Sequence, residues 1–176
     1  TLAGTPAGVA ARTQLHILFT AECTDQFEWM AAGMFDSFRN VYGDDFDEGD
    51  VKITRLLACS DEQLKEYSRS PGFMMGPTFI HPNYKLNPHN GDMSGSYNKP
   101  GSIMHWVRDS PDAADTDYVL FLDADMVLRG RVDLMEVGAQ PGVVVSAAVH
   151  YLVGCKNGLA QRFLPADTDW NLAQPG

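Results

Sequence analysis

The chain has 176 residues, of which 44% are hydrophobic and 20% charged, enough for one domain with a sizeable core. Its formal net charge of −10, from 23 acidic and 13 basic residues, argues against a general surface for nucleic acids or anionic membranes. No apolar stretch approaches the roughly 18 residues that cross a bilayer, so we expect contact with a membrane only through an anchor outside this chain.

The chain opens with a predicted leader, strand and helix. Residues 1–13 are small and featureless, which favours a flexible leader. Residues 15–20 form a first apolar strand, and Thr24 then makes a good N-cap for a helix. The helix carries an apolar stripe at helical spacing: Phe27, Met30, Ala31, Met34, Phe35 and Phe38. We interpret this stripe as core and not as a ligand pocket.

A second strand and helix follow the same order. Residues 51–58 are predicted to form a strand, and Ser60 caps a short helix that runs through Tyr67. Strand, helix, strand, helix in this order predicts an α/β fold with a mostly parallel sheet and right-handed crossovers.

The segment from Pro71 to Gly101 loses all periodicity. Pro, Gly, Asn, Met and Tyr dominate it, and a loop of this length in a compact domain is often functional. A helix is expected after it, with Asn98 as a possible cap and Pro100 in the first turn. Pro111 is expected to end that helix.

The most informative motif lies in residues 117–128. Val119–Leu122 contain no charge and indicate a strand buried on both faces, which ends on the carboxylates of Asp123 and Asp125. Ligands of open α/β sheets bind at the carboxyl ends of the strands, and paired carboxylates there suit Mg²⁺ or Mn²⁺ shared with a diphosphate. The motif therefore predicts a metal-assisted site for a nucleotide-linked substrate, although acidic residues also end many strands without binding anything.

The last part of the chain gives weaker signals. A short helix is predicted over residues 132–137 and a strand over residues 143–148, and the rest has loop character. We therefore expect a ligand-binding subdomain over residues 14–150. Residues 151–176 show no closing element, so we expect the fold to be incomplete at the C-terminus and the chain to be a piece of a longer protein.

Three cysteines fit no zinc spacing. Cys23 and Cys59 each follow a predicted strand, so they are near enough for a disulfide if the two strands are neighbours. Two buried free thiols are the alternative. Cys155 would be unpaired or bonded outside this chain.

Three segments together resemble a known family. They are His16–Cys23 with Phe27-Glu28-Trp29, then Ile53–Cys59, then Tyr97–Gly101 through His105-Trp106-Val107 to Phe121–Met126. In this order they are similar to the N-terminal half of GT-A type glycosyltransferases, which have a Rossmann-like sheet flanked by helices. The resemblance implies that residues 14–150 bind the nucleotide sugar and that residues 151–176 begin an acceptor-binding half. Within that fold they most resemble the plant and algal peptidyl serine α-galactosyltransferases, with the hydroxyproline arabinosyltransferases as near relatives.

The resemblance implies an activity and a setting. The donor would be a UDP-sugar, most simply UDP-galactose, with Mn²⁺ or Mg²⁺ as cofactor and the anomeric configuration retained. The acceptor would be a serine hydroxyl of hydroxyproline-rich cell-wall glycoproteins. A lumenal address in the endoplasmic reticulum or Golgi follows, and it makes the bond between Cys23 and Cys59 more plausible.

The resemblance also assigns residues to the site. Asp123 and Asp125 would hold the metal, with Asp125 the stronger candidate for direct coordination. The alternative for Asp123 is contact with the donor ribose or with the metal through water. Donor contacts would come from the residues after the first strand, from one arginine and from the start of the third helix: Thr20, Ala21, Glu22, Arg55, Asn98 and Lys99. A third metal ligand, usually a His nearer the C-terminus, has no match here, and no catalytic residue is assigned.

Three other protein classes share part of this pattern. A hydroxyproline arabinosyltransferase shares the motifs in looser form. A catalytically silent module of the same fold, kept for binding or structure, is compatible with the charge. A nucleotide-sugar pyrophosphorylase normally has a Gly-rich loop after its first strand, and Thr20–Thr24 contain no glycine, which argues against that class.

Overall fold

The computed structural model describes residues 13–44, 46 and 49–146. The chain separates into two compact units, one that ends at Leu134 and one that begins at Met135, and each is described by itself. Among the described helices, none has the length and apolar character that a membrane span requires.

The first unit contains all the regular elements among the described residues. In chain order they are β1 (Leu15–Glu22), α1 (Asp25–Tyr42), β2 (Val51–Cys59), α2 (Asp61–Tyr67), η1 (Pro71–Met74), β3 (Thr78–Pro82), η2 (Gly95–Tyr97), α3 (Asn98–Asp109), η3 (Pro111–Asp115) and β4 (Tyr118–Asp123).

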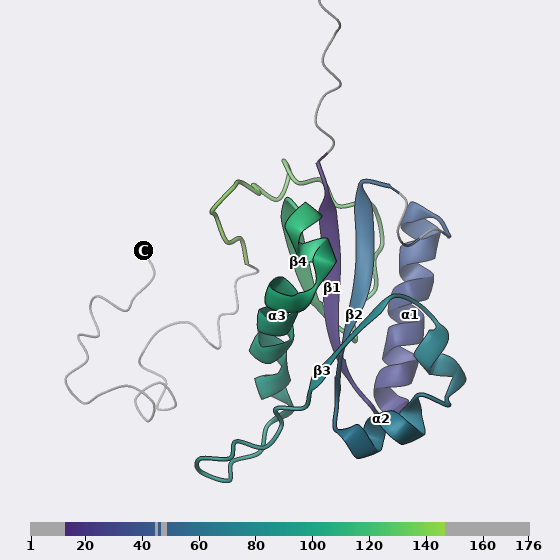
Figure 1. The fold of residues 1–176 in the computed structure, drawn as a ribbon. Coiled ribbons are helices and arrows are strands. Elements are labelled where there is room, and N and C mark those ends of the chain that lie inside the picture. Colours follow the sequence, from purple (N-terminus) through teal and green to yellow (C-terminus); the bar gives the residue numbers. More distant parts are fainter. Residues whose placement is uncertain (1–12, 45, 47–48, 147–176) are drawn as a thin grey trace, which may run out of the picture. The chain divides into compact units, whose positions relative to one another are not determined.

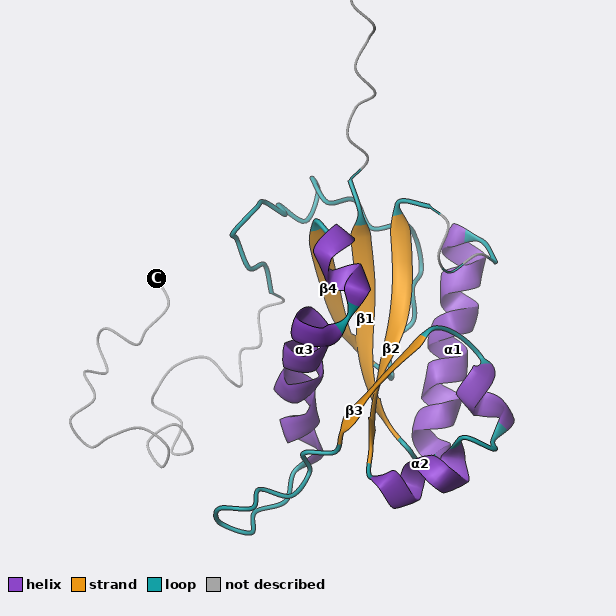
Figure 2. Ribbon diagram, viewed as in Figure 1, coloured by secondary structure: helices purple, strands orange, loops and turns teal. Residues whose placement is uncertain are grey.

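The four strands form one parallel sheet in the order β3-β2-β1-β4. Helices pack on both faces of it (Figures 1 and 2). The predicted α/β class with a mostly parallel, Rossmann-like sheet is therefore confirmed.

Alternation along the strands decides which helix each residue faces. Ile17 and Phe19 of β1 pack with Phe35 and Phe38 of α1 in the main core. Leu18, one residue out of phase, packs on the opposite face with Leu56 and Trp106 of α3. Because Thr20 and Glu22 continue the alternation of Leu18, they lie on the α3 face.

The predicted caps of the first two helices are confirmed. The Thr24 side chain accepts a hydrogen bond from the Phe27 amide, and Ser60 forms a complete capping box with Gln63. The cap expected for the third helix is wrong. Tyr97 occupies the N-cap of α3, and Asn98 is its first helical residue with its side chain bonded elsewhere.

The segment expected to be a long loop contains β3. Its residues Thr78–Pro82 are flanked by Pro77 and themselves include a proline, so the sequence carries a weak strand signal. The proline is tolerated because it is the last residue of the strand, which lies at one edge of the sheet.

β4 occupies the opposite edge of the sheet. In the described part of the chain it pairs only with β1, and Val119 is 45% exposed. The prediction that Val119–Leu122 are buried on both faces is therefore wrong, although the strand itself is present.

Two predictions near the C-terminus also differ from the structure. Residues 134–138 form turns where a helix over 132–137 was expected, and so short a helix has little stability of its own. Val132 instead donates its amide hydrogen to the Tyr42 hydroxyl. Residues 143–146 are irregular and not a strand. Residues 147–148, Cys155 and the expected boundary at 150/151 lie outside the described residues.

A disulfide joins the ends of β1 and β2. Cys23 and Cys59 are bonded, with their Cα atoms 5.5 Å apart. The parallel register explains this, because Glu22 pairs with Ala58 and the two cysteines are the next residues along their strands. The disulfide alternative is thus the one the structure supports.

Candidate functional site

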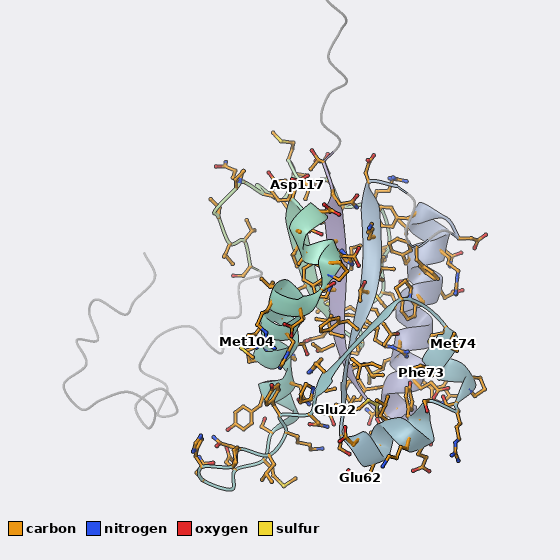
Figure 3. All side chains as sticks on the ribbon, in the orientation of Figure 1. Glu22, Glu62, Phe73, Met74, Met104 and Asp117 are labelled. Carbon is orange, nitrogen blue, oxygen red and sulfur yellow. A yellow bond between two sulfur atoms is a disulfide. The ribbon has the colours of Figure 1, made fainter. Side chains whose placement is uncertain are left out.

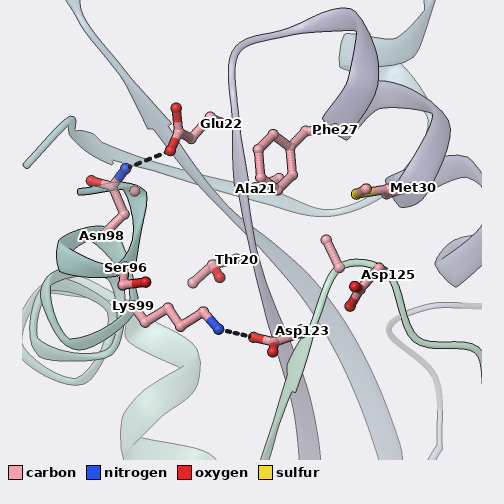
Figure 4. Close-up of a pocket in the computed structure, with 12 residues that line it drawn as sticks. Thr20, Ala21, Glu22, Phe27, Met30, Ser96, Asn98, Lys99, Asp123 and Asp125 are labelled. Carbon is pink, nitrogen blue, oxygen red and sulfur yellow. Dashed lines mark hydrogen bonds and ion pairs between the residues drawn. The ribbon is translucent and has the colours of Figure 1, made fainter. Parts of the chain in front are cut away.

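A cavity of about 320 Å³ lies at the carboxyl ends of β1 and β4 (Figure 4). Figure 3 labels Glu22 at this end of the sheet and Asp117, which precedes β4, at the other. The lining comes from the ends of both strands, the start of α1 and the segment from η2 into α3: Thr20, Ala21, Glu22, Phe27, Met30, Gly95, Ser96, Asn98, Lys99, Asp123, Ala124 and Asp125.

The strand register brings the predicted residues together. Thr20 of β1 pairs directly with Asp123 of β4. Asp123 has the same phase as Phe121, which packs on the α3 face, so Thr20, Glu22 and Asp123 belong to one face of the sheet. The first turn of α3 covers this end of that face, which encloses the cavity.

The Asp-x-Asp motif forms a turn at the end of β4. The Asp123 carbonyl accepts a hydrogen bond from the Met126 amide at 3.2 Å. Ala124, between the two acids, is only 4% exposed and joins the main core. The buried alanine anchors the turn, so the carboxylates of Asp123 and Asp125 are both presented to the cavity.

Lys99 reaches across the cavity to this motif. Its Nζ lies 2.5 Å from Oδ1 of Asp123, and the two side chains are 42% and 41% exposed (Figure 4). Asp125 is exposed and makes no ion pair or hydrogen bond within the described residues. Of the two acids, Asp125 is therefore the one ready to accept a ligand.

Asn98, at the start of α3, is hydrogen-bonded to Glu22 at the end of β1 and to the loop that precedes η2. Its side-chain amide donates to Oε1 of Glu22 at 3.3 Å and to Oδ1 of Asn83 at 3.2 Å, and it accepts from the Tyr84 amide at 2.7 Å. Asn98 is only 2% exposed and Glu22 only 8%. Lys85 lies 3.8 Å from the other oxygen of Glu22. Asn98 thus lines the cavity, but its polar atoms are engaged by the protein.

Arg55 is the predicted donor contact that the structure places elsewhere. It pairs with Phe19 in the register, so it faces α1, on the other side of the sheet from Thr20 and Glu22. Its guanidinium is fully buried and donates to the carbonyls of Gly72 and Phe73 and to Thr78 and Tyr67. Burial lowers the pKa of Arg55, and Tyr67 partly offsets this. The arginine fastens η1 and β3 to β2.

Several lining residues were missed by sequence reasoning. Phe27 and Met30 were assigned to the core stripe of α1, and both pack against the core while their remaining surface lines the cavity. Gly95 and Ser96 lie in the segment without periodicity. A side chain at Gly95 would begin only 2.9 Å from Oε1 of Glu22, so the absence of one keeps that wall open.

The histidines within the described residues lie away from the two acids. His81 is 3% exposed, contacts Ser102 and the Pro82 carbonyl, and has its pKa lowered by burial. His105 contacts the Tyr84 hydroxyl and Asp109. None of them lines the cavity.

The donor set fits a divalent cation that is shared with a substrate. No group of three or more His, Cys, Asp or Glu side chains able to hold a metal occurs in the described ranges. Mg²⁺ is usually bound by one or two carboxylates and completed by substrate phosphates and water. Asp123 and Asp125 supply the two carboxylates, and the cavity leaves room for the remainder.

Comparison with known proteins gives two similar relatives. Over 156 residues, or 88% of its length, the chain is 37% identical to a peptidyl serine alpha-galactosyltransferase of Arabidopsis thaliana. Over 159 residues, or 90% of its length, it is 32% identical to a peptidyl serine alpha-galactosyltransferase of Chlamydomonas reinhardtii. The matches cover 18% and 20% of those proteins, so the chain spans about a fifth of their length. No protein-family model matches the chain, and no solved structure matches it.

Proposed function

Because this chain belongs to the family of the peptidyl serine alpha-galactosyltransferases, we propose that its cavity binds the sugar-nucleotide donor of a metal-assisted glycosyltransferase. The donor is UDP-galactose and the acceptor is a serine hydroxyl of a peptide. The observation that carries this proposal is the convergence of the Asp-x-Asp turn, Lys99 and the end of β1 on one cavity at the carboxyl edge of a parallel sheet.

The charges in the cavity favour a cation together with a diphosphate. Among the described residues that line the cavity, the three carboxylates of Glu22, Asp123 and Asp125 are opposed by one ammonium, that of Lys99. A diphosphate would be repelled by this surplus of negative charge. A divalent cation bound by Asp123 and Asp125 would reverse the sign locally and stabilise the charge that develops on the leaving diphosphate.

The remaining lining suits the nucleoside. Thr20, Ala21 and Glu22 offer backbone and side-chain polar groups at the end of β1, and Phe27 and Met30 offer apolar surface beside them. A uracil ring needs this combination of polar edge contacts and an apolar face. Lys99, in the first turn of α3, would contact the phosphates.

The proposed reaction transfers galactose from UDP to a serine oxygen. The bond from the galactose anomeric carbon to the β-phosphate oxygen breaks, and a bond from that carbon to the serine oxygen forms. UDP leaves with the bonding electron pair, and the serine proton is released. An α-linked product from an α-linked donor means that configuration is retained.

The disulfide supports a place in the secretory pathway. Bonded cysteines persist in oxidising compartments such as the lumen of the endoplasmic reticulum. The bond between Cys23 and Cys59 therefore agrees with a lumenal enzyme of the endoplasmic reticulum or Golgi. Such an enzyme would meet hydroxyproline-rich glycoproteins on their way to the cell wall, and we propose these as the acceptors.

Calorimetric titration of the intact protein with UDP-galactose tests the donor site. We expect binding with Mn²⁺ present, at least tenfold weaker binding with EDTA, and loss of the Mn²⁺ dependence in Asp125→Ala. Asp115→Ala is the matched control, because it removes an exposed carboxylate in η3 that does not line the cavity. UDP-arabinose, titrated in parallel, tests the arabinosyltransferase alternative.

Two results would refute the donor site. Binding that is equal with Mn²⁺ and with EDTA would remove the role assigned to the Asp-x-Asp turn. An equal loss of binding in Asp115→Ala and Asp125→Ala would show that the effect does not come from the cavity.

A further inference from the structure

We propose that Lys99 is an exchange residue, which pairs with Asp123 while the cavity is empty and moves to the diphosphate when the donor binds. The exchange makes the cation and the diphosphate help each other to bind. This inference rests on the proposed donor site and adds to it a device that couples its two ligands.

The ion pair has the geometry of a reversible contact. Lys99 Nζ lies 2.5 Å from Asp123 Oδ1, and both side chains are about two-fifths exposed. Pairs exposed to this degree favour the contact only about 1.5- to 5-fold, because solvent screens them and the long lysine side chain loses freedom on pairing. The pair is strong enough to be populated and weak enough to be broken by a ligand.

The ammonium and a divalent cation compete for the same carboxylate. Because Lys99 already pairs with Asp123, a metal held by Asp123 and Asp125 would meet the Lys99 ammonium there, and the two positive charges would repel each other. The cation must therefore displace Lys99 from Asp123, which weakens binding of the cation alone. Asp125, which has no partner of its own within the described residues, does not impose this cost.

A diphosphate removes the competition. It offers Lys99 new oxygen acceptors inside the same cavity, so Asp123 is released to the cation. Each ligand breaks the same ion pair, and whichever binds second does so without that cost. By linkage the effect is reciprocal: the cation strengthens diphosphate binding by the same factor as the diphosphate strengthens cation binding.

Lys99 is the only cationic side chain among the described residues that line the cavity. Lys85, the nearest comparison, lies 3.8 Å from Glu22 on the opposite wall and does not contact Asp123. Glu22 is itself held by Asn98. Removing the Lys85 charge changes the field in the cavity but leaves the exchange intact, so it makes a matched control.

The test measures the Mn²⁺ dissociation constant of the intact protein with and without saturating UDP, by electron paramagnetic resonance of free Mn²⁺. The ratio of the two constants is the coupling factor. In Lys99→Met we expect Mn²⁺ alone to bind about 1.5- to 5-fold more tightly and the coupling factor to fall by the same ratio, which is the range that such a partly exposed ion pair supports. Part of the coupling should remain, because phosphate oxygens would also serve as ligands of the metal.

The controls separate exchange from simple charge removal. Lys85→Met should leave the coupling factor unchanged, even if it shifts both Mn²⁺ constants together. Lys99→Arg keeps the charge and the pairing, so it should retain the coupling. A thermal melt of each variant verifies that the fold is intact.

Two outcomes overturn the exchange while leaving the donor site standing: an unchanged coupling factor in Lys99→Met, or an equal fall in Lys85→Met. A wild-type protein in which UDP and Mn²⁺ bind independently would overturn the exchange and the proposed function together. The two failures are therefore distinguishable.

Discussion

Reduction of the disulfide between Cys23 and Cys59 should destabilise the protein by a predictable amount. The bond closes a loop with a sequence separation of 36 residues and joins the end of β1, which carries Glu22, to the end of β2. Breaking it restores conformational freedom to the unfolded chain and leaves the folded sheet with its other contacts.

The chain-entropy relation gives the size of the effect. A loop of this length corresponds to about 3.8 kcal/mol near room temperature. Both sulfur atoms also lie in a buried cluster with Ala21, Leu57 and Tyr67, so replacing both cysteines by alanine removes packing as well. The double variant should therefore lose somewhat more than reduction alone, by about 1 kcal/mol.

Urea unfolding, followed by the fluorescence of the buried Trp106, measures this directly. The wild type should lose about 4 kcal/mol of unfolding free energy in reducing agent. The variant with Cys23→Ala and Cys59→Ala should show no response to reducing agent. A wild-type transition that is the same in both conditions would refute the reasoning.

Three further predictions concern buried polar groups. Arg55→Met should lower the unfolding free energy by about 3 kcal/mol, because four buried acceptors lose their hydrogen-bond donor. The affinity for UDP should be unchanged. Weaker UDP binding in a stable variant would instead show that Arg55 contacts the sugar nucleotide. Burial lowers the pKa of His16 from 6.5 to about 4. The neutral imidazole therefore contributes its full stabilisation above pH 6.5, and the unfolding free energy should fall by about 3 kcal/mol as the pH drops toward 4. The decline should be smaller in His16→Gln, and an identical pH profile would contradict the assignment. Asn98→Ala should lower the unfolding free energy by about 3 kcal/mol, because three hydrogen bonds are lost. It should also weaken UDP binding at least fivefold, because Glu22 is no longer held in place. Calorimetry that finds an unchanged UDP affinity would show that Glu22 needs no such support.

Local signals were enough to predict most of the fold. β1 and β2 are rich in apolar residues, and the first two helices carry side-chain caps at Thr24 and Ser60. β3 was not predicted, because it forms by pairing with β2 and because Pro77 and Pro82 weaken its local strand signal. The burial of β4 was overestimated because an apolar run does not reveal whether a strand lies at the edge of a sheet.

The sequence indicated which candidate residues lie at strand ends, but not which face of the sheet each side chain occupies. Asp123, Asp125 and the end of β1 converge because parallel strands end at one edge of the sheet. Arg55 was assigned to this group by its strand, but alternation turns its side chain toward α1. The support that Asn98 gives to Glu22 could not be read from the sequence, since it depends on Asn83 and Tyr84 in the preceding loop.

Transfer itself is the most direct test of the account. The intact protein is incubated with UDP-galactose, Mn²⁺ and a serine-containing, hydroxyproline-rich peptide, and the product is analysed by mass spectrometry with mapping of the modified residue. We predict one hexose on serine, absent with EDTA and absent in Asp125→Ala. A protein that binds UDP-galactose and Mn²⁺ but adds no sugar to serine would contradict the account and identify the chain as part of a catalytically silent module.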